Sequence, residues 1–250
     1  DLSELEGPWM AAIELLKELE AVDSEQYIND AIKAGKKVLA EGAQGTMLDI
    51  DFGTYPFVTS SNTVTAGTCT GLGVAPTKIG NVIGIFKAYC TRVGSGPFPT
   101  ELEDEVGEKI RKEGSEFGAT TGRPRRCGWV DLPQLKYAIM INGASELSMM
   151  KADVLDNFDT IRVCTHYLID GERYDYFPYD VNDVEVVPVY EDIKGWNCDT
   201  TKLTSINDAP AELKAYVEYL ERNLEVPITV VSVGPDRTQT LENKENKVLA

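Results

Sequence analysis

The chain has 250 residues, with 24 Lys and Arg against 41 Asp and Glu, which gives a formal net charge of −17 at pH 7. Hydrophobic residues make up 42%, enough apolar mass to offset the entropy of folding, so a disordered chain is excluded. The acidity argues against non-specific nucleic-acid binding, which needs a broad basic surface, but it allows one local basic pocket. The five cysteines form no C-x-x-C pair. We therefore expect neither a disulfide framework nor a structural zinc site, and a cytoplasmic location. No apolar run approaches the roughly 20 residues of a membrane span.

The first third of the chain predicts helices followed by a long loop. Apolar residues recur at helical spacing within residues 8–34, with a break at 21–25, so two helices are expected there. A short apolar run at 38–40 predicts a buried strand. Residues 42–75 are rich in Gly, Thr, Ser and Asn, and a loop of this length with apolar anchors is typically ordered and functional. Residues 82–93 are apolar and are expected to pass from helix to strand.

The rest of the chain alternates between the two kinds of element. The expected helices cover 101–116, 132–141 and 210–224, and the expected buried strands cover 147–150 and 228–233. Asp170-Gly171 between two β-prone runs predicts a hairpin. Strands that alternate with helices predict an α/β fold with a mixed, mostly parallel sheet and an antiparallel excursion near 161–190.

The first candidate site is the Gly-Thr-Arg loop at 118–126. Three arginines fall within four positions, and no acid lies between Phe117 and Val130. Guanidinium groups bind carboxylate and phosphate oxygens in pairs, and threonine hydroxyls and glycine amides add neutral donors. This composition favours an anion site. The alternative is a surface loop whose arginines pair with nearby acids.

Three further segments are weaker candidates taken singly. Lys151-Ala152-Asp153 follows an expected strand, where an aspartate can accept two guanine N–H groups. By itself, this three-residue pattern is more often a surface ion pair. Ser232-Val233-Gly234 lies where an expected strand ends at Gly-Pro. Ligands commonly bind at such strand ends in α/β sheets, and the alternative is a plain turn. Gln44 follows another expected strand, and Thr59 lies further along the same loop. Their amide and hydroxyl groups can hydrogen-bond to a purine edge or a phosphate. The alternative is a turn whose polar groups bond only to one another. The sequence contains no G-x-x-x-x-G-K-[ST] phosphate loop.

Taken together, the order and spacing of these segments resemble the adenylosuccinate synthetase family. The most specific string runs from Glu41-Gly42-Ala43-Gln44-Gly45 to Ser60-Ser61-Asn62, and the similarity extends over about 8–241. The resemblance implies a GTP-dependent ligase of AMP synthesis that needs Mg²⁺. GTP phosphorylates the 6-oxygen of IMP, and the amine of L-aspartate then displaces that phosphate to give adenylosuccinate.

The resemblance also assigns roles to residues. Gln44, Thr59 and Arg123 would contact IMP. Arg125 would also reach GTP. The guanine base would be selected by Lys151 and Asp153, with Ala152 between them. The guanine pocket would be completed by Ser232, Val233 and Gly234. The aspartate-binding loop would comprise Ala119, Thr120, Thr121, Gly122, Arg123, Pro124 and Arg125.

One departure from the family is large. The family's phosphate loop, catalytic aspartate and catalytic histidine, and most of its Mg²⁺ ligands, have no counterpart in this sequence. We therefore expect residues 1–250 to be the C-terminal part of one larger synthetase domain, inactive or nearly so alone, and homodimeric when complete. The alternative is a non-catalytic purine-nucleotide-binding module derived from the family. A membrane or nucleic-acid partner is not expected.

Overall fold

The computed structural model describes residues 2–120 and 122–243, which fall into two compact units. The N-terminal unit runs from the start of the described chain to Glu41 and from Thr68 to Lys78. The main unit contains Gly42–Gly67 and the chain from Ile79 onward. The prediction that all 250 residues belong to one larger domain stays a prediction.

The N-terminal unit is helical. It contains α1 (Ser3–Lys17), α2 (Ser24–Lys33), most of α3 (Ala66–Leu72) and the short 3₁₀ helix η2 (Pro76–Lys78), so the two helices predicted around a break are confirmed. Neither α1 nor α2 has a buried residue. The strand predicted at 38–40 is wrong, and Leu39 is 88% exposed. A strand needs a neighbouring backbone to pair with, and among the described residues none pairs with 38–40.

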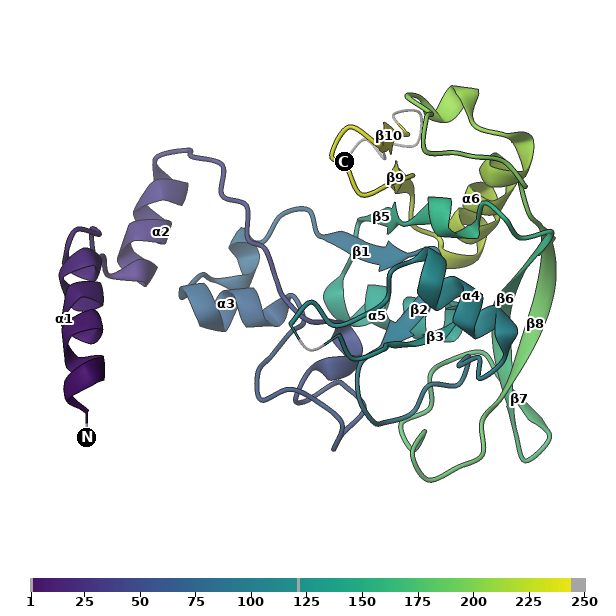
Figure 1. Cartoon of the computed structure of the whole chain (residues 1–250), viewed down its shortest axis with the longest axis horizontal. Helices are drawn as coiled ribbons and strands as arrows, with labels where there is room; N and C mark the ends of the chain where they lie inside the picture. Colours follow the sequence, from purple (N-terminus) through teal and green to yellow (C-terminus); the bar gives the residue numbers. More distant parts are fainter. Residues whose placement is uncertain (1, 121, 244–250) are drawn as a thin grey trace. The chain divides into compact units, whose positions relative to one another are not determined.

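The main unit is built on a four-stranded sheet in the order β1-β5-β9-β10 (Figure 1). Its strands are β1 (Ile83–Lys87), β5 (Glu146–Met150), β9 (Ile228–Ser232) and β10 (Thr240–Glu242). β1, β5 and β9 run parallel, and β10 returns antiparallel to β9. The predicted mixed, mostly parallel sheet is confirmed.

Two smaller sheets complete the main unit. One joins β2 (Cys90–Arg92) to β3 (Arg126–Gly128), and the other joins β4 (Val130–Asp131), β6 (Thr160–Ile169), β7 (Glu172–Tyr174) and β8 (Val187–Lys194). Asp170 and Gly171 both have positive φ, as a two-residue hairpin turn requires, and they connect β6 to antiparallel β7. The antiparallel excursion near 161–190 is confirmed.

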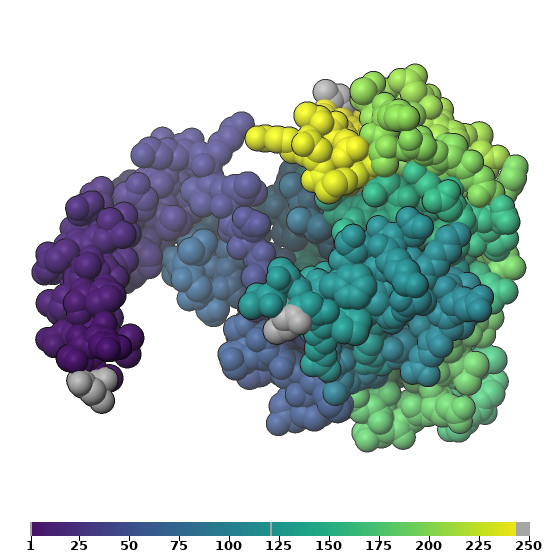
Figure 2. Space-filling model, in the orientation of Figure 1, coloured from purple at the N-terminus to yellow at the C-terminus, as the bar shows by residue number. Residues whose placement is uncertain are grey.

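Three helices connect the strands: α4 (Glu105–Glu113), α5 (Leu132–Asn142) and α6 (Ala211–Leu224). Short 3₁₀ turns lie at η1 (Thr46–Leu48), η3 (Ala152–Leu155) and η4 (Ile206–Asp208). α6 buries one apolar stripe against the sheet, and the Tyr216 hydroxyl donates to the Ala88 carbonyl at 3.0 Å. At the end of the described chain, Gln239 donates to the Thr201 carbonyl, and Figure 2 shows the yellow C-terminal segment against the green segment.

Two expected elements differ in extent. Residues 82–93 contain no helix, because Ala88 continues the pairing of β1 by donating to the Met150 carbonyl before the chain turns into β2. The helix expected over 101–116 covers only α4, since the Asp104 carboxylate caps its first turn and Glu101 pairs with Gly128 instead. Within the described part of the chain, no helix combines the length and the apolar character that a bilayer crossing requires.

Candidate functional site

The candidate site lies where the parallel strands of the main sheet end. Lys87 is the last residue of β1 and pairs with Met150, the last residue of β5, so Lys151 follows directly beside it. Val233 follows β9, which is paired with β5 on its other side. Three loops therefore leave one edge of the sheet together, the edge where α/β proteins bind ligands.

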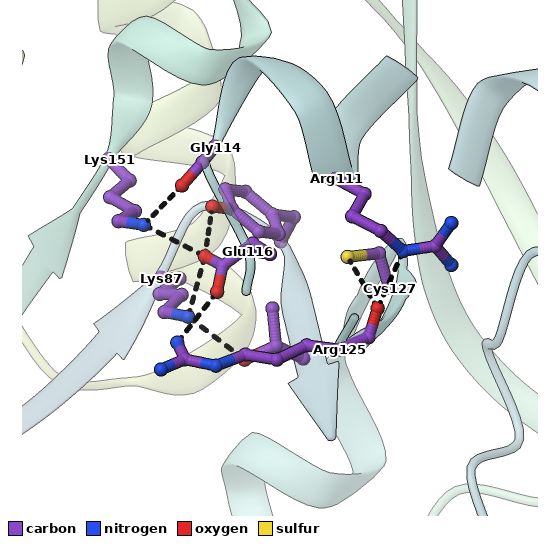
Figure 3. Close-up of polar contacts among 9 residues, drawn as sticks. Lys87, Arg111, Gly114, Glu116, Arg125, Cys127 and Lys151 are labelled. Atoms are coloured by element: carbon purple, nitrogen blue, oxygen red, sulfur yellow. Dashed lines mark hydrogen bonds and ion pairs between the residues drawn. The ribbon is translucent and has the colours of Figure 1, made fainter. Parts of the chain in front are cut away.

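A buried glutamate gathers cations at this edge (Figure 3). The Glu116 side chain has no exposed surface, and its Oε1 accepts from Lys87 Nζ at 2.7 Å and from Lys151 Nζ at 2.9 Å. Its Oε2 accepts from Arg125 Nη1 at 2.8 Å, and the Tyr89 hydroxyl donates to Oε1 at 2.5 Å. Three cations around one carboxylate leave local positive charge in a chain whose net charge is −17. We call these five side chains the Glu116 cluster.

The pKa values in the Glu116 cluster follow from burial and these donors. Burial alone would raise the pKa of Glu116, but hydrogen bonds from Lys87, Tyr89 and Lys151 outweigh it and hold the pKa at about 2. Burial lowers the pKa of Lys87, against the hydrogen bond and the charge of Glu116, and Lys151 and Arg125 lower it further. The like charges oppose one another, and an incoming anion would relieve that repulsion.

The Gly-Thr-Arg loop begins directly after Glu116 and forms a tight turn. Phe117 bridges to Pro124, and the Gly118 N–H donates to the Arg123 carbonyl at 2.8 Å. Gly122 has a φ of +65°, which a residue with a Cβ rarely adopts, and its N–H donates to the Gly118 carbonyl. The predicted residues Ala119, Thr120, Gly122, Arg123 and Pro124 are exposed on this turn, and Thr121 lies outside the described residues.

Two predicted site residues carry buried polar atoms that have no hydrogen-bond partner among the described residues. They are Nε of Arg125, a donor, and Oδ1 of Asp153, an acceptor. Burial raises the pKa of Asp153, although the neighbouring Lys151 lowers it in part. Buried polar atoms are normally paired. These two unpaired atoms therefore mark places where a ligand can donate to one and accept from the other.

The Lys151-Ala152-Asp153 turn and the end of β9 are closely packed. Lys151 has a φ of +61°, and Ala152 is fully buried at the start of η3. Ser232 is buried and donates to the Gly234 carbonyl at 3.0 Å, and Val233 is held by the Gln239 carbonyl. A Cβ at Gly234 would meet the end of the Gln239 side chain, which would have to move to admit it. The segments that were predicted to form one pocket thus follow neighbouring parallel strands.

Gln44 and Thr59 lie on a different part of the main unit, the loop 42–67. Gln44 is exposed with a φ of +62°, and the Thr59 N–H donates to the Leu48 carbonyl at 2.8 Å. This loop is held to α5, because Asn142 donates to Thr46 and Tyr137 donates to the Phe52 carbonyl. The contacts of the Glu116 cluster thus join the predicted aspartate loop, which includes Arg123, to the predicted guanine pair. Gln44 and Thr59 lie on the loop 42–67, which is anchored separately.

Sequence reasoning missed Glu116, Lys87 and Tyr89 as members of the site. A signal was present, since Glu116 is the last acid before the acid-free stretch from Phe117 to Val130. Lys87 is also the one cation between residues 79 and 91. What the sequence does not contain is the three-dimensional proximity of these segments. Among residues 2–120 and 122–243, no group of three or more His, Cys, Asp or Glu side chains is placed to hold a metal ion.

Comparison with known proteins points to one family. The model of the adenylosuccinate synthetase family matches residues 4–241. The chain is 62% identical to the adenylosuccinate synthetase of Phocaeicola vulgatus and 63% identical to that of Bacteroides thetaiotaomicron, in each case over 97% of this chain and 57% of the relative. It therefore spans little more than half the length of these curated relatives.

Solved structures agree with the fold. The fully ligated adenylosuccinate synthetase from Plasmodium falciparum superposes with a TM-score of 0.89 at 39% identity, over 96% of this chain and 57% of that one. The succinoaminodeoxyadenylate synthetase of cyanophage S-2L, bound to dGMP and dATP, shares the fold alone, with a TM-score of 0.56 at 20% identity. The extent of the family match and the identity to the bacterial relatives settle the assignment: this chain belongs to the adenylosuccinate synthetase family.

Proposed function

We propose that this chain supplies the guanine and aspartate subsites of a GTP-dependent carbon–nitrogen ligase that joins IMP and L-aspartate to give adenylosuccinate, in AMP synthesis. The observation that carries the proposal is the pair of buried, unpartnered atoms, Arg125 Nε and Asp153 Oδ1. One is a donor suited to an anion and the other an acceptor suited to a base. The Glu116 cluster joins the two segments that hold them.

The guanine subsite is assigned to the turn after β5. Asp153 Oδ1 would accept from the N–H groups of guanine, and the stem of Lys151 would lie along the base. Ser232, Val233 and Gly234, at the end of the neighbouring β9, would close the pocket from the other side. Burial of Asp153 suits this role, because a desolvated acceptor gains more from a ligand donor than an exposed one does.

The aspartate subsite is assigned to the loop 119–125, where exposed Arg123 and half-buried Arg125 offer guanidinium groups. A carboxylate binds such a group through two parallel hydrogen bonds. Arg125 would also reach the GTP phosphates, and Arg123 would bridge aspartate to IMP. Gln44 and Thr59 would contact IMP from the loop 42–67.

We further propose that these residues form part of a longer enzyme, because they span 57% of the length of the curated relatives. The 250 residues contain no Gly-rich phosphate loop. The chain alone would then bind nucleotide without turnover, and the complete protein would be a cytoplasmic homodimer. Mg²⁺ would enter with GTP. Since the described residues hold no group suited to a metal, no step is assigned to Mg²⁺ here.

The test is turnover by the complete polypeptide that carries this segment, with IMP, aspartate and GTP, together with its Asp153→Asn variant. We expect adenylosuccinate from the wild type and a rise in KM for GTP of about tenfold or more in the variant, because an amide cannot accept from both guanine donors. The KM for IMP should stay constant. Asp192→Asn, which alters an exposed aspartate of β8 paired with Arg162, is the matched control. Absence of product would overturn the function, and an unchanged KM for GTP would overturn the guanine subsite.

A further inference from the structure

We propose that Glu116 is a positioning residue that joins the guanine subsite to the aspartate loop, so that one buried carboxylate sets the place of Lys151 and Arg125 together. The inference rests on the proposed function for the identity of the two ligands. Its geometry is independent of that identity. Lys151 meets Oε1 at 2.9 Å, and Arg125 meets Oε2 at 2.8 Å.

Glu116 lies behind the cations that it holds. Its side chain has no exposed surface, whereas the side chains of Lys151 and Arg125 are 37% and 32% exposed. The carboxylate accepts four hydrogen bonds, because Lys87 and Tyr89 also donate to Oε1, and a carboxylate has about four acceptor sites. It is therefore occupied by protein donors. Lys151 and Arg125 are more exposed than Lys87, whose side chain is 25% exposed, and they are the cations best placed to meet a ligand.

The backbone strengthens the same connection. The Arg125 N–H donates to the Glu116 carbonyl at 2.9 Å, and the Lys151 ammonium also donates to the Gly114 carbonyl at 2.7 Å. The aspartate loop, through Arg125, and the turn after β5, through Lys151, thus both contact residues 114–116. Lys87, at the end of β1, and Tyr89 fix the carboxylate from the sheet side. A shift of Glu116 would move both subsites relative to the sheet.

Neutralising Glu116 has two opposed effects on anion binding. The Glu116→Gln variant leaves three neighbouring cations without their counter-ion, so repulsion would spread them apart and the amide could not hold both subsites. The same change makes the site more positive, which by itself would tighten anion binding. If positioning is the role of Glu116, the loss of geometry dominates and both ligands bind more weakly.

The experiment compares Glu116→Gln and Glu116→Asp with Glu101→Gln in the complete polypeptide. Glu101 is the matched control, because it forms an ion pair with Arg126, next to Arg125, and touches neither Lys151 nor Arg125. We expect the KM values for GTP and for aspartate to rise together by about tenfold in Glu116→Gln. The KM for IMP should rise less, because only Arg123 of the proposed IMP contacts lies on the displaced loop. Glu116→Asp keeps the charge on a shorter side chain and should recover part of the loss.

A second readout needs no substrate. Amide hydrogen exchange should accelerate in both 118–125 and 151–155 in Glu116→Asp, and in neither segment in Glu101→Gln. Unchanged or lower KM values for GTP and aspartate, or exchange that accelerates in only one of the two segments, would overturn the positioning role. If the wild-type polypeptide gave no turnover, the proposed function would be overturned. The hydrogen-exchange result would still decide whether Glu116 positions the two segments.

Discussion

The guanidinium of Arg125 has one nitrogen bound to the protein and another without a partner. One terminal nitrogen, Nη1, is bound to Glu116, while Nε is buried without a partner. A buried donor that is left unpaired costs about 1–3 kcal/mol, and an acceptor on a bound ligand would offset that cost. The adjacent Arg126 differs, since its guanidinium is bound by Glu101 and by the carbonyls of Gly94 and Gly96.

This contrast gives a residue-scale prediction for Arg125→Lys. A lysine keeps the charge toward Glu116 but has no Nε and no planar fork, so it cannot bind a carboxylate through two parallel bonds. We expect the KM for aspartate to rise by about tenfold to a hundredfold in steady-state kinetics. Arg126→Lys serves as the control and should lower stability without changing that KM. Equal effects from the two variants would remove Arg125 from the aspartate subsite.

At the same scale, the sequence identified the residues with distinctive chemistry and missed their common anchor. The arginines of 123–126 and the pair Lys151 and Asp153 stand out by type and spacing. Glu116 is marked only by its place before the acid-free stretch, because an acid beside a charged helix is ordinary in a chain with 41 Asp and Glu. Its role depends on β1 and β5 ending side by side, a long-range register that no local pattern encodes.

At the scale of elements, the loop 42–67 is organised around one buried carboxylate. Asp49 has no exposed surface, and its oxygens accept from the backbone N–H groups of Asp51, Phe52, Thr63 and Val64. Burial would raise the pKa of Asp49, but these four donors outweigh it and lower the pKa. The loop therefore has a polar core in place of an apolar one, and this carboxylate holds the two arms of the loop together.

The corresponding prediction concerns Asp49→Asn. An amide nitrogen cannot accept, so two of the four backbone donors would lose their partner, at a cost of about 2–4 kcal/mol in the free energy of unfolding. Urea unfolding at pH 7 measures this loss, and hydrogen exchange should accelerate within 47–64. Asp51→Asn, on the exposed side of the same loop, is the control. A variant as stable as the wild type would show that the carboxylate does not organise the loop.

Elements whose apolar residues pack within this chain were predictable, and the run at 38–40, which has no neighbouring strand among the described residues, was not. α5, α6, β5 and β9 follow their apolar patterns closely. Residues 38–40 have the composition of a buried strand, yet in the described structure they are exposed and form no strand. Apolar composition thus predicts a preference for burial, while the partner decides whether a strand forms.

At the scale of the whole molecule, two buried acids make stability depend on pH in opposite directions. Glu116 has a pKa of about 2, below its ordinary 4.5, so its contribution is present above pH 4.5 and is lost as the pH falls toward 2. Asp131 has no exposed surface, and burial raises its pKa to about 6, against hydrogen bonds from Tyr167 and Gln134. Between pH 3.8 and 6 the folded state therefore holds a proton on Asp131 that the unfolded state has lost.

The proton held by Asp131 can be detected in the pH dependence of unfolding. Because unfolding releases the Asp131 proton within this window, the free energy of unfolding should fall as the pH rises through 6. Asp131→Asn carries no such proton, so the stability advantage of the wild type over the variant should shrink by about 1–1.5 kcal/mol from pH 5 to pH 7. Urea unfolding across this range stays above the sequence pI of about 4.5 and measures the difference. Asp192→Asn, on exposed β8, gives the background slope. A difference that is constant with pH, or that grows, would mean that Asp131 is ionised in the folded protein throughout this range, with Tyr167 and Gln134 compensating its burial in full.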